Sequence, residues 1–319
     1  MKRGIALMES DEPAAIVEAL TYFDRALALR LDLPLDEFPR LRYGLAACWL
    51  NRGDALVRLG DPARLPAAVH AYDEGIAAMR DLDLFADPLY PRRLVIAHQN
   101  RGIARLAQGP DGLNDAVRSL AEAIAILDGE PAAAMPDREH LRAAAWMNLA
   151  NVHAADPSHA SDTAAHDAAR RALTMVAELE ATDPAAAEVG LKARHVLCRI
   201  VAVRLTSSGA PAPGAIDAIG APDDLTMPDD VHEATDAVDE GLALVRQWEQ
   251  RGVPHFRLLA CDLFRFGARV YARYQPQFLE EFVLENVDAA QSSREFVLSE
   301  ELQAAAHEAL ELLNRPSST

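Results

Sequence analysis

A small residue that returns about every 49 positions constrains this chain more than any other feature. The first three copies are 49 residues apart and lie in the similar segments KRGIALMESD, NRGDALVRLGD and NRGIARLAQGP. The next two intervals are 48 residues and the last is 70. These six residues, called the anchors below, are Gly4, Gly53, Gly102, Ala150, Cys198 and Ala268. Self-similarity at a fixed period is typical of proteins that stack copies of one supersecondary motif, so the sequence predicts six repeats.

A second pattern recurs between successive anchors, with residues spaced by four, three, one and three positions. In the second repeat it reads Ala68, Tyr72, Gly75, Ile76 and Met79. Equivalent sets begin at Ala19, Ala116, Ala165 and Ala234. This spacing places all five residues on one face of an α-helix. Each repeat is therefore expected to be an antiparallel pair of helices, in which small residues allow close approach and larger ones fill the neighbouring groove.

The two patterns together resemble the tetratricopeptide repeat. The second repeat carries the matching residues, which are Asn51, Gly53, Ala55, Gly60, Ala68, Tyr72 and Ile76. The usual period of that family is about 34 residues, so this chain is expected to have longer turns. The resemblance therefore predicts the pairing of the helices but not the curvature of the superhelix. The resemblance implies an all-α fold: a right-handed α-solenoid of stacked antiparallel helix pairs, a TPR-like superhelix. We expect a single solenoid of about six pairs over residues 1–298.

Two parts of the chain depart from the pattern. Residues 206–229 are rich in Pro, Gly, Ala and Asp, which predicts a flexible insertion. It is either a lid or docking segment, or a tolerated surface insertion. The second helix of the last repeat, 277–293, lacks the small residues that recur at fixed positions in the other second helices, as is common in terminal repeats. Residues 299–319 are expected to form a C-terminal capping helix and a disordered tail.

Charge and composition exclude several classes of partner. The net charge of −18 disfavours nucleic acid and anionic lipid surfaces as general partners. No apolar stretch approaches the roughly 20 residues that span a bilayer, and the first ten residues do not resemble a secretion signal, so we expect a cytoplasmic protein. Cys48, Cys198 and Cys261 lie within apolar helical patterns and are expected to be small buried side chains.

Catalytic motifs are not visible in the sequence. The glycines are periodic and do not form a phosphate-binding loop, and no nucleophile elbow or paired-cysteine metal motif is present. His153, His159 and His166 lie near Asp156 and Asp162, but their spacing suits neither one helical face nor a zinc finger. We therefore expect no enzyme, no cofactor and no metal site.

The resemblance also indicates a binding face. In tetratricopeptide proteins the concave surface is lined mainly by the first helix of each pair, around the anchor. In the second and third repeats the corresponding residues include Asp54, Val57, Arg58 and Ile103. The polar and basic candidates further along are Asn151, Lys192, His195, Arg199, Arg265, Arg269 and Arg273.

These basic residues have helical spacings of three or four, so they form stripes, and they resemble a loose form of the carboxylate clamp of some tetratricopeptide modules. Arginines arranged in this way can hold carboxylates in a bidentate manner. The alternative is that they pair with Asp and Glu of neighbouring helices, or that they lie on the outer face if the helical register is shifted by one residue.

The expected function is a non-catalytic scaffold that binds a protein or peptide partner in its concave groove, through acidic groups of the partner if the basic stripes face it. The alternative is a regulatory receptor or sensor for a small anionic ligand or a signalling peptide. Stacked repeats also expose apolar ends, which leaves a homo-oligomer open.

Overall fold

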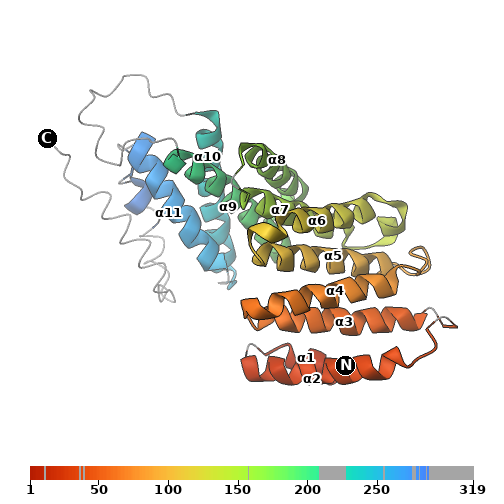
Figure 1. Cartoon of the computed structure of the whole chain (residues 1–319). Coiled ribbons are helices and arrows are strands. Elements are labelled where there is room, and N and C mark those ends of the chain that lie inside the picture. The colour runs from red at the N-terminus through yellow and green to blue at the C-terminus, as the bar shows by residue number, and fades with distance from the viewer. Residues whose placement is uncertain are drawn as a thin grey trace. The chain divides into compact units, whose positions relative to one another are not determined.

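The computed structural model describes residues 1–10, 12–35, 37–38, 40–156, 158–207, 228–253, 256–274, 278–279, 281–284 and 286. In these residues all regular secondary structure is helical, as predicted (Figure 1). The chain divides into two compact units, Met1–Ser161 and Asp162–Thr319. The single solenoid over 1–298 stays a prediction.

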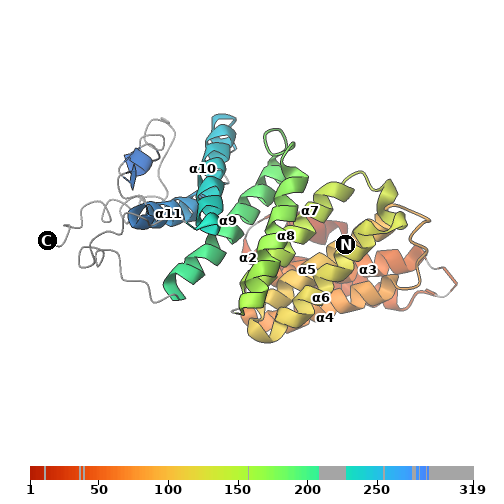
Figure 2. The same ribbon diagram turned by 90° about the horizontal axis from the view of Figure 1, so that it is seen from above.

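The first unit is a row of helices, each packed on the next in chain order. Its helices are α1 (Lys2–Leu7), α2 (Pro13–Leu31), α3 (Arg40–Arg58), α4 (Leu65–Met79), α5 (Leu89–Ala107), α6 (Leu113–Asp128) and α7 (Arg138–Ala154). Figure 1 shows α2, α3, α4 and α5 lying one above the next, and Figure 2 looks at the same row from above; α5 also contacts α3 and α7. This arrangement confirms the sequential pairs that the two sequence patterns predict, and it is consistent with a helical repeat.

The glycine anchors explain how closely the two helices of a pair approach. A Cβ atom added to Gly4 would lie 2.8 Å from the ring of Phe23, and one added to Gly53 would lie 2.7 Å from the ring of Tyr72. At Gly102 the corresponding contact is Leu120, at 2.9 Å. In each pair the large residue of the second helix therefore occupies the space that the anchor leaves empty.

The turn between paired helices also repeats. Gly60 and Gly109, which are 49 residues apart, have positive φ angles of 66° and 87° and follow the ends of α3 and α5. Only glycine adopts this conformation without steric cost, so it ends helices commonly. Each glycine is followed by a short 3₁₀ turn, Pro62–Arg64 or Pro110–Gly112, which leads into the second helix.

An ion pair recurs between successive pairs with the same period. Arg52 on α3 lies 2.8 Å from Asp24 on α2, and 49 residues later Arg101 on α5 lies 2.5 Å from Asp73 on α4. The carboxylates are half exposed, so each contact adds little stability by itself. Its recurrence shows that the first two junctions between pairs share one geometry.

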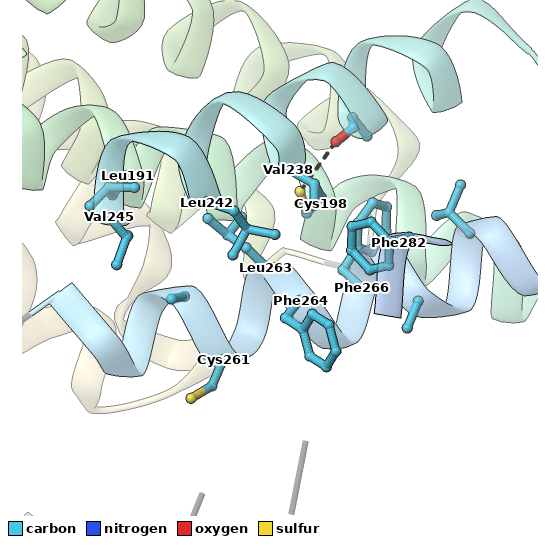
Figure 3. Close-up of a cluster of buried hydrophobic side chains, with 14 of the residues drawn as sticks. Leu191, Cys198, Val238, Leu242, Val245, Cys261, Leu263, Phe264, Phe266 and Phe282 are labelled. Carbon is cyan, nitrogen blue, oxygen red and sulfur yellow. Dashed lines mark hydrogen bonds between the residues drawn. The ribbon is translucent and has the colours of Figure 1, made fainter. Parts of the chain in front are cut away.

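The second unit contains α8 (His159–Val176, whose first three residues belong to the first unit), α9 (Pro184–Ser207), α10 (Asp229–Gln250) and α11 (Arg257–Tyr274). Helices α9, α10 and α11 pack on one another. Their core includes the anchors Cys198 and Ala268 and a group of aromatic side chains. Phe264 and Phe282 stack with ring centres 5.5 Å apart (Figure 3).

Most of the sequence-predicted irregular segments lie outside the described residues. Helix α9 continues to Ser207 and α10 begins at Asp229, so the ends of the predicted 206–229 loop are helical, and 208–227 are not described. In 277–293 the described residues, 278–279, 281–284 and 286, are helical. The predicted capping helix and tail, 299–319, are outside the described part.

Two further expectations concern the described residues. Cys48, Cys198 and Cys261 are all buried free thiols, as predicted. Among the helices described, none combines the length and apolar character that crossing a membrane requires.

His98 on α5 is expected to make the first unit less stable in acid. Burial, with a smaller contribution from the Arg101 charge, lowers the pKa of His98 to about 4 from an unfolded value of 6.5. The folded state therefore resists a proton that the unfolded chain accepts, so stability is lost as the pH falls from 6.5 towards 4. We expect a loss of roughly 2 kcal/mol between pH 7 and pH 5 from this group.

Urea denaturation gives the free energy of unfolding at pH 7 and pH 5 for wild type and for His98→Gln. The contribution of His98 is the loss between the two pH values in wild type minus the loss in the variant. An equal pH dependence in wild type and His98→Gln would contradict the assignment.

Candidate partner-binding surfaces

A groove in the first unit gathers residues from four helices. It has a volume of about 470 Å³, within the range of small-ligand sites. Its lining residues are Ile5, Met8, Asn51, Asp54, Val57, Arg58, Tyr72, Asn100 and Ile103. Three of them, Ile5, Asp54 and Ile103, directly follow an anchor in α1, α3 and α5. We call this surface the Asp54 groove.

The Asp54 carboxylate joins three helices at this groove. Its Oδ1 atom accepts a hydrogen bond from the Tyr72 hydroxyl of α4 at 2.8 Å and one from the Asn100 amide of α5 at 2.9 Å. Burial raises the pKa of Asp54, and the two hydrogen bonds and the more distant Arg93 charge only partly oppose this. In the same contact, burial and the neighbouring carboxylate raise the pKa of Tyr72, so the phenol remains a donor.

The walls of the groove are largely apolar. Ile5 and Ile103 are 42% and 41% exposed, so their aliphatic side chains are accessible in the groove. Arg58 lies at the rim, where its guanidinium donates to the main-chain oxygens of Met8 and Ser10 after α1. The groove therefore combines accessible aliphatic surface with one carboxylate that accepts hydrogen bonds from Tyr72 and Asn100.

The basic residues predicted for the binding face are only partly brought together. Asn151 lies on α7 of the first unit, with its amide 3.5 Å from the sulfur of Met147. Lys192, His195 and Arg199 lie on α9, and Arg265 and Arg269 lie on α11. The side chain of Arg273 is outside the described part.

Two of the predicted side chains meet at one carboxylate. Asp262 on α11 lies 3.8 Å from His195 and 3.5 Å from Arg265, so the stripes of α9 and α11 do approach each other. Burial lowers the pKa of His195, and Asp262 partly offsets this. Lys192 forms an ion pair with Glu188 one turn earlier on its own helix. Lys192, His195 and Arg265 therefore all have a carboxylate of the same unit beside them.

Burial also affects Arg199, and it distinguishes this residue from the neighbouring Arg269. Arg199 is half-buried, and its burial lowers the pKa of the guanidinium. Arg269, in contrast, is exposed.

A buried ion-pair network around Arg194 of α9 was not predicted from the sequence. Arg194 is only 7% exposed, and its guanidinium binds both oxygens of the buried Glu180, at 2.6 and 3.0 Å. Glu240 on α10 approaches the same guanidinium at 3.1 Å from the solvent side. Because Glu180 lies in the turn before α9, the periodic pattern gives no sign of this contact. The signal that could have found it is Gly190, one turn before Arg194, where an added Cβ would lie 1.5 Å from Glu180 Oε1.

The histidine and aspartate group considered as a metal site is dispersed. His153 lies 3.3 Å from the Ser161 hydroxyl, whereas His166 contacts Glu233 of α10 at 2.8 Å. In the part of the chain that the structure describes, no three His, Cys, Asp or Glu side chains are grouped closely enough to hold a metal ion.

These surfaces belong to an all-α protein whose helices pack in sequential pairs, in an arrangement consistent with a helical repeat. Comparison with protein-family models gives no match for the chain, and no curated protein matches it either. The comparisons therefore assign no family.

Proposed function

We propose that this protein is a non-catalytic, tetratricopeptide-like scaffold that holds a peptide segment of a protein partner in the Asp54 groove. The observation that carries the proposal is the gathering of residues at one repeated position, directly after the anchors, around a single groove. Repeat proteins bind extended segments in this way, because each repeat presents the same position to the same side. The apolar walls supply the contact area on which such binding depends.

The acidic-partner form of the proposal has weaker support. It would use α9 and α11, where Asp262 already lies beside His195 and Arg265. A carboxylate of a partner would have to compete with this internal one. We therefore base the functional test on the Asp54 groove.

The test is selection of a displayed library of random nine-residue peptides on the full chain, followed by fluorescence anisotropy of the recovered peptides. We expect Ile103→Arg to weaken their binding by about tenfold or more, because a charge would replace an apolar wall residue. Ile103 is 41% exposed, so the substitution should leave the fold intact, which circular dichroism verifies.

The matched control is Leu29→Arg, which introduces the same charge at an exposed leucine on α2, outside the residues that line the groove. It should leave the affinities unchanged. Peptides that bind wild type and Ile103→Arg equally well would show that the groove is not the binding surface.

A further inference from the structure

The two oxygens of the Asp54 carboxylate differ, because only Oδ1 accepts a hydrogen bond among the described residues. Its Oδ1 is occupied by Tyr72 and Asn100, and Asp54 forms no ion pair among the described residues. The nearest basic side chain of the lining, Arg58, directs its guanidinium to the carbonyl oxygens of Met8 and Ser10. Asp54 therefore lines the groove without an ion pair among the described residues, while Arg58 is bound to main-chain oxygens and the Arg93 charge acts on Asp54 only from farther away.

The surroundings of this carboxylate match a cation on an aliphatic chain. Ile5, Met8, Val57 and Ile103 provide apolar walls, along which a side chain of several methylene groups can lie. The protein as a whole carries a net charge of −18, which attracts basic partners and repels acidic ones. The Asp54 carboxylate and the net charge of the protein thus favour a positive ligand, whereas the Arg58 guanidinium of the lining is bound to main-chain oxygens.

The hydrogen-bond pattern distinguishes lysine from arginine. A guanidinium binds a carboxylate best through two parallel bonds, one to each oxygen, and Oδ1 of Asp54 already accepts two hydrogen bonds. An ammonium is a compact donor that needs only the remaining oxygen. Asn51 and Asn100 also line the groove, and their amide carbonyl groups can accept its other protons.

We propose that the Asp54 groove binds a lysine side chain of a basic peptide segment, with the ammonium on Asp54 and the methylene chain between Ile5 and Ile103. This inference rests on the proposed function and specifies its partner. The raised pKa of Asp54 adds a consequence: binding should weaken on acidification at a higher pH than an ordinary aspartate would require, because the protonated acid loses its charge.

The experiment uses four nine-residue peptide libraries, fluorescently labelled, with a fixed central lysine, arginine, glutamate or norleucine and random flanking positions. Norleucine keeps the aliphatic chain of lysine and removes the charge. Binding to the full chain is measured by anisotropy. We expect the lysine library to bind about tenfold or more tightly than the norleucine and glutamate libraries, and more tightly than the arginine library.

Two variants locate the preference. Asp54→Asn keeps the size of the side chain and should remove the advantage of lysine over norleucine. The control is Glu122→Gln on α6, which removes one exposed charge elsewhere and should preserve that advantage.

The results separate the two proposals. Peptides that bind, lose affinity with Ile103→Arg and show no preference for lysine would overturn the lysine inference and leave the scaffold function standing. A lysine preference that survives Asp54→Asn would also overturn it. If none of the four libraries binds, both proposals fail.

Discussion

Replacing Glu180 by alanine should destabilise the second unit by about 3 to 5 kcal/mol. The guanidinium of Arg194, 7% exposed, would keep its charge and lose both hydrogen bonds to Glu180, and a buried charge without its partner is costly. Glu240 could compensate only in part, because its side chain is 66% exposed and its own contact is screened by water. Denaturation followed by fluorescence measures the effect. With Trp49 and Trp146 replaced by phenylalanine, Trp248, whose indole donates to the Glu180 carbonyl oxygen, reports on the second unit.

Two comparisons make this result specific to burial. Glu240→Ala removes a carboxylate from the same guanidinium and should cost less than about 1 kcal/mol. The double variant Glu180→Leu with Arg194→Met removes both charges and should recover much of the lost stability, because apolar pairs commonly replace buried ion pairs without loss. If Glu180→Ala and Glu240→Ala cost the same, the buried pair does not have the role that its geometry indicates.

Replacing the anchor Gly53 by valine should destabilise the first unit by about 2 to 3 kcal/mol. Even a Cβ at this position lies 2.7 Å from the ring of Tyr72, and valine adds two methyl groups in the same space. The ring cannot move aside easily, because Tyr72 is 2% exposed and its hydroxyl is bound to Asp54. The small gain in helix propensity from removing a glycine does not offset this overlap. Thermal and urea denaturation followed by circular dichroism measure the change.

The cause can be tested by making room for the new side chain. In a Tyr72→Leu background the same Gly53→Val substitution should cost less than about 1 kcal/mol, because the ring that it meets is gone. Ala121→Val on the exposed face of α6 is the control for introducing valine into a helix, and it should cost only a few tenths of a kcal/mol to about 0.7 kcal/mol. An undiminished cost in the Tyr72→Leu background would exclude the ring contact as the cause.

The sequence was most informative where one physical requirement repeats. Gly53 and Tyr72 could be paired in advance, because a small residue is followed 18 or 19 positions later by a large one in Gly4 with Phe23 and in Gly102 with Leu120 as well, and each of these pairs is in contact. The same repetition placed Asp54, Val57, Arg58 and Ile103 on one predicted face, and these four residues line the Asp54 groove, whereas the other lining residues were not assigned to that face.

The contacts between charged side chains were harder to predict from the sequence. The basic stripes of α9 and α11 suggested an acidic ligand, but the structure places Asp262 beside His195 and Arg265. Arg194, two positions after Lys192, gave no sign of its buried role. The partners of a charged side chain depend on the rotation of each helix and on the conformation of the preceding turn, and helical periodicity specifies neither.

By itself, then, the sequence determined that this chain forms helices, that they pair in order, and which small residues lie where the helices touch. Burial of apolar faces obeys a local period, so it can be recognised without knowing the neighbours. Only the tertiary structure decided that Asp54 lines a groove with Tyr72 and Asn100 bound to its Oδ1 atom, and that Glu180 forms a buried ion pair with Arg194. Electrostatic contacts at these sites join residues 14 to 46 positions apart, and their strength depends on distances and solvent exposure that exist only in the folded chain.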